Sequence, residues 1–177
     1  MHRLQKGAQF TGAHPAWVKT ESLHITLVFL GWIEATRREA IEKALAASCE
    51  LSNAFELRFR RIELFPTPRQ PRVISIGIEG GAGGEEDVSE LKHLYRKLNL
   101  KLSEAEFATE AREFRPHLTL ARIKSMKGVS GLRSLVESHA FEKTDSFPVK
   151  DAVLYQSHLK RDGAEYEVLS QRLLRKL

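Results

Sequence analysis

The sequence predicts an α+β fold in which residues 1–177 form one two-lobed domain, and three observations support this. Strand and helix patterns are interspersed, several strand-to-strand connections are short, and no low-complexity linker divides the chain. Short connections favour antiparallel pairing over a doubly wound parallel sheet. A chain of 177 residues that is 42% hydrophobic can bury a sizeable core.

The first half of the chain is predicted to contain three strands and two helices. Residues 22–31 are mostly aliphatic or aromatic and indicate a buried strand, and residues 34–47 are rich in helix formers. Residues 55–60 alternate apolar and charged side chains, and residues 73–78 form an apolar strand. The proline-rich loop between these two strands carries Arg69 and Arg72, which we interpret as solvated in preference to the alternative that they guide RNA. A glycine-rich turn at 80–84 then precedes a helix over 88–98.

The second half is predicted to contain three more strands and one helix. Residues 115–123 are predicted to form a strand, and the proline near its start is compatible with this because the first residues of a strand need not donate to the ladder. Residues 132–136 suggest a helix. Residues 149–159 and 164–170 form two strands joined by a turn at 160–163. The Asp-Gly pair in that turn is a good hairpin signal.

Two His-x-Thr-x motifs carry the chemistry, His24-Ile25-Thr26-Leu27 and His117-Leu118-Thr119-Leu120. Side chains alternate between the two faces of a strand, so each His shares a face with its own Thr. The motifs lie about half the chain length apart, which suggests an internal duplication. Side by side, two such strands would place two imidazoles and two hydroxyls around one small volume. That arrangement suits a phosphodiester that needs proton donation, proton removal and anion binding.

Chance is a poor explanation of the repeated motif. With 7 His and 8 Thr in 177 residues, about 0.3 His-x-Thr pairs would arise at random. Ordinary histidines on a polar sheet face, with Thr present for its β-propensity, explain each copy but not the pair. We take His14 and His158 as bystanders because neither lies in a matched motif, and we assign Trp17 and Phe29 to core packing.

Composition limits the partner and the compartment. Lys and Arg outnumber Asp and Glu by 28 to 23, and the formal charge of +5 favours an anionic partner such as nucleic acid. Cys49 is the single cysteine, so the chain has no disulfide framework and no thiol set for zinc. No third metal ligand lies near either motif at a metal-binding spacing, and we expect no metal and no cofactor. No apolar run reaches membrane-spanning length and no signal-peptide core is present, so we expect a cytoplasmic monomer without membrane contact.

Three sequence blocks, residues 17–31, 114–122 and 154–169, resemble the two-histidine phosphoesterase superfamily. Within it they are similar to the bacterial and archaeal RNA 2′,3′-cyclic phosphodiesterases, also called 2′-5′ RNA ligases. The resemblance implies a bilobal fold with two related antiparallel sheets, covering helices and a central cleft that holds both motifs. Members usually begin with an apolar strand, whereas residues 2–10 here are mostly polar. We therefore expect a first lobe without that strand, or a chain that starts late.

The reaction that the resemblance implies is hydrolysis of an RNA 2′,3′-cyclic phosphate to a 2′-phosphate. One of His24 and His117 would act as base and the other as acid, and the sequence leaves open which is which. Thr26 and Thr119 would donate to the non-bridging phosphoryl oxygens. By reversal, the same groups would allow weak 2′-5′ ligation.

Arg122 and Arg115 are the candidate substrate-binding cations. Strand parity places residue 122 on the face opposite His117 unless the strand ends or bulges there. A non-catalytic RNA-end binding module, and a phosphodiesterase for another small cyclic nucleotide, remain open as alternatives.

Overall fold

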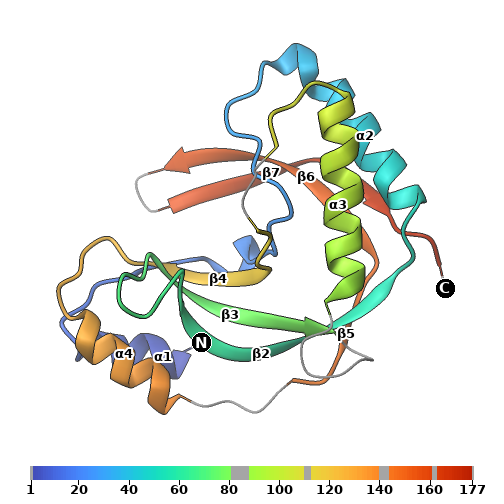
Figure 1. Cartoon of the computed structure of the whole chain (residues 1–177). Helices are drawn as coiled ribbons and strands as arrows, with labels where there is room; N and C mark the ends of the chain where they lie inside the picture. The colour runs from blue at the N-terminus through green and yellow to red at the C-terminus, as the bar shows by residue number, and fades with distance from the viewer. Residues whose placement is uncertain (1, 81–87, 110–112, 140–143, 161–162, 177) are drawn as a thin grey trace.

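The computed structural model describes residues 2–80, 88–109, 113–139, 144–160 and 163–176, and it has two antiparallel sheets. The larger sheet has the strand order β1-β4-β3-β2-β5, and the smaller is the hairpin β6-β7 (Figure 1). The predicted α+β class with two antiparallel sheets is confirmed, although the sheets differ in size. The strands are β1 (Ala16–Trp17), β2 (Phe55–Phe65), β3 (Val73–Gly80), β4 (His117–Arg122), β5 (Phe147–Val149), β6 (Asp151–Lys160) and β7 (Gly163–Leu173).

Four α-helices in the described residues pack in two pairs at opposite ends of the molecule (Figure 1). Helix α1 (His2–Gln9) packs on α4 (Val129–Ser138), which contacts β2. Helix α2 (Arg38–Glu50) packs on α3 (Ser89–Glu104) and on both strands of the hairpin. None of the helices in the described ranges is long and apolar enough to cross a membrane.

The core extends between these layers, and its largest fully buried apolar side chains are Leu4, Leu57, Ile74, Leu94, Leu102 and Leu132. Cys49 on α2 is also buried, and burial raises the pKa of its thiol to about 11. The side chain therefore packs as a neutral thiol at physiological pH. Trp17 is partly buried against the core, as predicted, but Phe29 is 69% exposed, so its assignment to core packing was wrong.

The predicted strand over residues 22–31 was also wrong as a regular strand. A short 3-10 helix occupies Thr20–Ser22, and the rest of the segment is joined to a sheet at one point, the antiparallel bridge between Ile25 and Leu118 of β4. Its apolar side chains, including Leu23, Leu27 and Leu30, pack partly buried against the core. The apolar run thus indicated burial correctly, but burial alone did not produce a strand ladder.

The other predicted elements are present with shifted boundaries. Strand β2 runs five residues past the predicted end at residue 60, and α3 runs six residues past residue 98. A 3-10 helix at Ala35–Arg37 delays the start of α2. Strands β1 and β5 were not predicted, because two or three residues carry no readable alternation. Residues 2–9 are helical, and no strand precedes Ala16 in the described residues. The predicted turn at 80–84, beyond Gly80, and the centre of the 160–163 turn lie outside the described residues.

Candidate active site

The bridge between Ile25 and Leu118 brings the two His-x-Thr motifs together. In an antiparallel pair, the residue before one bridge partner lies opposite the residue after the other. His24 is therefore opposite Thr119, and Thr26 is opposite His117. All four lie on the face opposite the one that Ile25 and Leu118 share. The two histidines thus lie on a diagonal, and in a regular ladder residues on such a diagonal lie roughly 7–8 Å apart, a spacing that one phosphoryl group can span.

Each histidine is oriented by the same backbone contact. Nδ1 of His24 lies 2.8 Å from the carbonyl oxygen of Ser22, and Nδ1 of His117 lies 2.9 Å from that of Arg115. A carbonyl oxygen only accepts, so each Nδ1 carries a proton and donates it. In the neutral ring Nε2 then has no proton and accepts one, and in the charged ring Nε2 donates. Both rings are thus prepared for proton transfer through Nε2.

The first motif lies between the two sheets. While Ile25 bridges to β4, the ring of His24 contacts Tyr155 of β6 and Tyr166 of β7, with ring centres 5.8 Å and 4.7 Å away. Strand pairing places these tyrosines on one face of the hairpin, since Tyr155 is opposite Val168 and Tyr166 is opposite Ser157. The hairpin therefore forms one wall of the site.

The second histidine has different neighbours. His117 stacks on Phe65 of β2, with ring centres 4.4 Å apart and planes inclined by 21°. The guanidinium of Arg115 lies over the same Phe65 ring, 5.0 Å from its centre. Sequence reasoning missed Phe65, Tyr155 and Tyr166. The alternation of the hairpin strands was the signal that could have indicated the tyrosines, whereas Phe65 carried none.

A β-bulge decides the direction of Arg122. The pairing of β4 with β3 shifts by one residue, so that Ser75 is opposite Thr119 but Ile74 is opposite Ala121. The extra residue reverses the alternation, and Arg122, opposite Val73, returns to the face of His117 and Thr119. Strand parity alone places residue 122 on the opposite face unless the strand ends or bulges there, and the structure has that bulge. Arg122 is exposed and available on the site face.

The remaining candidates differ in exposure. Thr26 is exposed, while Thr119 is half-buried on β4.

His158 pairs with Glu167 at 2.9 Å; it lies opposite Glu165, on the hairpin face that does not carry the two tyrosines. Within the described ranges, no three His, Cys, Asp or Glu side chains are grouped to hold a metal ion.

Two antiparallel sheets with paired His-x-Thr motifs facing one another between them form the architecture of a two-histidine phosphoesterase. The chain belongs to the 2′-5′ RNA ligase superfamily, whose sequence profile matches residues 2–161. The resemblance seen in the motif blocks is thereby confirmed.

Relatives and solved structures agree with this family. The chain is 33% identical over 167 residues to the RNA 2′,3′-cyclic phosphodiesterase of Aeropyrum pernix, covering 94% of this chain and 90% of that one. It is 31% identical to the protein of the same name from Archaeoglobus fulgidus, over 86% of this chain and 80% of that one. TT0787 of Thermus thermophilus has the same fold, with a TM-score of 0.74, 24% identity and coverage of 99% and 89%. Escherichia coli LigT complexed with 3′-AMP gives a TM-score of 0.69 at 21% identity, with coverage of 98% and 87%.

Proposed function

We propose that this chain is an RNA 2′,3′-cyclic phosphodiesterase, a hydrolase that opens the cyclic phosphate at an RNA end to give a 2′-phosphate. The observation that carries the proposal is the bridge between Ile25 and Leu118, which sets His24 and His117 diagonally on one face. Relatives about 30% identical over most of the chain bear this activity as their name. The proposed form is a cytoplasmic monomer in which residues 1–177 work as one two-lobed domain.

The proposed reaction is an in-line displacement at phosphorus. A water oxygen forms the new bond to phosphorus while the bond from phosphorus to the 3′ oxygen breaks. Nε2 of one histidine takes a proton from the water, and Nε2 of the other gives a proton to the leaving oxygen. The matching Nδ1 contacts of His24 and His117 leave Nε2 available in both rings. His24 and His117 each suit either role.

The two threonines and Arg122 complete the proposed phosphate site. Hydroxyls of Thr26 and Thr119 donate to the non-bridging oxygens, which gain negative charge as the pentacoordinate state forms. Arg122 on the same face offers a guanidinium to the phosphate or to the RNA backbone. Arg115 has the smaller part, because its guanidinium lies over Phe65. The reverse path, attack of a 5′-hydroxyl on the cyclic phosphate, would give a 2′-5′ linkage.

Incubation with a 2′,3′-cyclic mononucleotide and with an oligoribonucleotide bearing that end, each in EDTA, tests the proposal. We expect both to be opened to the 2′-phosphate with no loss of turnover on chelation, since protein groups supply both proton transfers. Loss of turnover in EDTA would indicate a metal-dependent reaction. Tight binding of the RNA end without turnover would indicate the binding module, and turnover of the mononucleotide alone would indicate a small cyclic nucleotide as substrate.

Replacing Thr119 with valine is expected to lower kcat/KM by about 10–100-fold, because one hydrogen bond to a charged group is lost in a site that keeps its shape. Thr119→Ser retains the hydroxyl and is the matched control, with activity expected within a few fold of wild type. Steady-state kinetics on the cyclic mononucleotide measure both variants. Equal activity in the valine and serine variants would remove Thr119 from the phosphate site.

A further inference from the structure

Positive charge is concentrated in three segments of the chain. Residues 1–20, 64–78 and 114–136 contain ten Lys and Arg and no Asp or Glu, although the whole chain has 28 basic and 23 acidic residues. We call these three segments the basic end. Glutamates border the segments, namely Glu21, Glu63, Glu79, Glu113 and Glu137, so the excess of positive charge lies within the segments and not beyond them.

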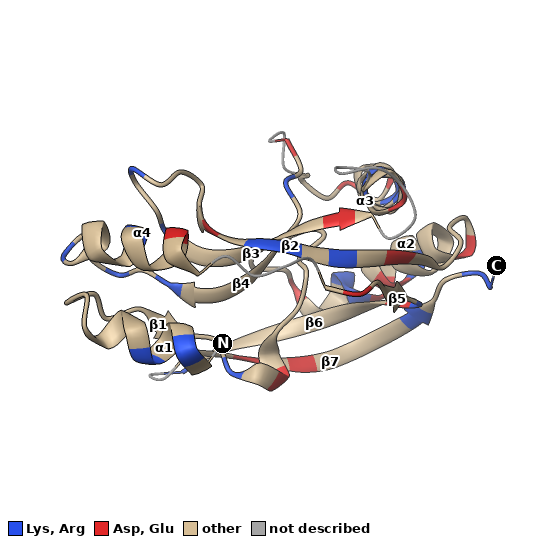
Figure 2. Cartoon of the chain, turned by 90° about the horizontal axis from the view of Figure 1, so that it is seen from below, with Lys and Arg blue, Asp and Glu red and all other residues tan. Residues whose placement is uncertain are grey.

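The fold brings the three segments together. Arg122 of β4 lies opposite Ala16 of β1 on one side and Val73 of β3 on the other. Helix α1 packs on α4, and the guanidinium of Arg133 on α4 donates to the carbonyl oxygen of Pro68 at 2.8 Å. In Figure 2, Lys and Arg lie on the segments around α1 and α4, together with an acidic residue on α4, and both kinds of charge occur toward the opposite end.

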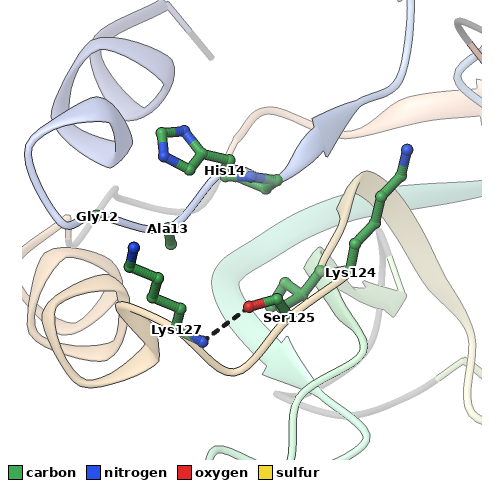
Figure 3. Close-up of a pocket in the computed structure, with 8 residues that line it drawn as sticks. Gly12, Ala13, His14, Lys124, Ser125 and Lys127 are labelled. Atoms are coloured by element: carbon green, nitrogen blue, oxygen red, sulfur yellow. Dashed lines mark hydrogen bonds between the residues drawn. The ribbon is translucent and has the colours of Figure 1, made fainter.

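A cavity of about 270 Å³ opens in the basic end, between the segment that precedes β1 and the loop that follows β4. His14 lies on the first side, and Lys124, Ser125 and Lys127 lie on the second (Figure 3). The side chain of Lys127 extends across toward Gly12 and Ala13, while its backbone N–H donates to Oγ of Ser125 at 3.0 Å. The volume lies just below the roughly 300–1,000 Å³ of sites for drug-sized ligands, and it is ample for one phosphate unit.

The cations at this cavity are not neutralised by the protein. Lys124 and Lys127 are exposed, and neither has a salt bridge to any carboxylate in the described ranges. His14 is also exposed. No Asp or Glu occurs within the three segments; Lys19 forms a 3.6 Å salt bridge with Glu165 from the hairpin, and the other Lys and Arg along the segments add to one positive field. An anion is therefore the ligand that the cavity would attract.

We propose that this cavity binds an internal phosphodiester of the RNA whose 2′,3′-cyclic end lies between His24 and His117; this inference rests on the proposed function. The cavity begins at Ile123, one residue beyond Arg122, which faces the histidine side of β4. Five residues of strand separate His117 from Arg122, roughly 15 Å. Arg122 would thus lie between the cyclic end and the cavity, and the RNA would follow β4. A mononucleotide held at the histidines does not reach Lys124 or Lys127.

The test compares substrates of different length in the double variant Lys124→Gln, Lys127→Gln. For the 2′,3′-cyclic mononucleotide, we expect kcat and KM to equal those of wild type. For an oligoribonucleotide of about five nucleotides with the same end, we expect KM to rise about tenfold with kcat unchanged. The dependence of log(1/KM) on log salt should flatten by about 0.7 for each phosphate that the variant no longer binds.

The matched control is Lys150→Gln, Lys176→Gln, which removes the same charge from two exposed lysines. Lys176 is next to the C-terminus, which lies at the other end of the molecule from α1 and α4 (Figure 1). We expect this control to leave the oligonucleotide KM near wild type. An equal rise of KM in both double variants would mean that net charge alone attracts the RNA, and no rise in either would mean that RNA does not enter the cavity. Both results overturn the inference.

A binding assay separates this inference from the proposed function. Fluorescence anisotropy with the same oligoribonucleotide measures Kd whether or not the cyclic end is hydrolysed. If wild type binds the RNA without opening the cyclic phosphate, the proposed function fails, and the cavity is still tested by the change in Kd between the two double variants. Hydrolysis with an unchanged Kd in Lys124→Gln, Lys127→Gln rejects the cavity and leaves the proposed function standing.

Discussion

Replacing either histidine of the paired motifs with alanine is expected to lower kcat on a 2′,3′-cyclic phosphate by about 10²–10⁴-fold. His24→Ala and His117→Ala each remove one proton transfer while the phosphate-binding hydroxyls remain, so KM should change little. The loss of kcat in the double variant, relative to wild type, should be much smaller than the product of the two single losses, because both residues act on one transition state. Stopped assays of the 2′-phosphate product measure all three.

The pH dependence of the two single variants distinguishes the base from the acid. Wild type should give a bell-shaped profile, because one imidazole acts in its neutral form and the other in its charged form. The variant that loses the acidic limb lacks the base, and the variant that loses the basic limb lacks the acid. His158→Ala is the control, since His158 is exposed and pairs with Glu167 on the other face of the hairpin. Undiminished turnover in both His24→Ala and His117→Ala would end the proposed mechanism.

Replacing Gly128 with alanine is expected to destabilise the fold by about 2–5 kcal/mol and to lower Tm by roughly 5–15 °C. Gly128 is the N-cap residue before α4 and has a φ of +73°, a conformation that costs roughly 1–2 kcal/mol for a residue with a Cβ. That Cβ would also lie 2.3 Å from the backbone nitrogen of Ala13 and 2.5 Å from the carbonyl oxygen of Thr11. Backbone atoms cannot move aside as a flexible side chain does, so α4 would have to separate from the segment before β1. Thermal and denaturant unfolding measure the loss.

Gly12→Ala is the matched control for this prediction. Gly12 has the same φ of +73°, but no atom lies within 4 Å of the position that its Cβ would take. The control therefore carries the conformational cost without the close approach, and we expect it to lose about 1–2 kcal/mol. Equal destabilisation of the two variants would show that the tight contact between Gly128 and residues 11–13 contributes nothing to stability.

Sequence patterning predicted most of the fold because strands β2, β3, β6 and β7 are long enough to show their period. It failed for the segment around His24, where an apolar run was interpreted as a strand. Half-buried side chains such as Leu27 and Leu30 require a core to pack against, not a strand neighbour on each side. The two motifs still lie side by side although this segment is not a regular strand, because one bridge at Ile25 joins it to β4.

The candidate site residues fall into two groups, those that a local motif predicts and those that only tertiary contacts bring to the site. His24, His117, Thr26 and Thr119 could be predicted as the site because the repeated motif is a local pattern, and their roles stay a prediction. Phe65, Tyr155 and Tyr166 were missed because their contacts with the histidine rings join parts of the chain far apart in sequence. His14, interpreted from the sequence as a bystander, lines a cavity whose second side is formed by Ile123, Lys124, Ser125 and Lys127.

The sequence by itself determined the α+β class and the family and predicted the four motif residues as the site, because periodicity and spacing are properties of neighbours along the chain. The tertiary structure alone decided which face Arg122 occupies, through one extra residue in β4, and gathered three acid-free segments into one basic end. Strand register and the packing of distant segments depend on contacts that no local pattern encodes.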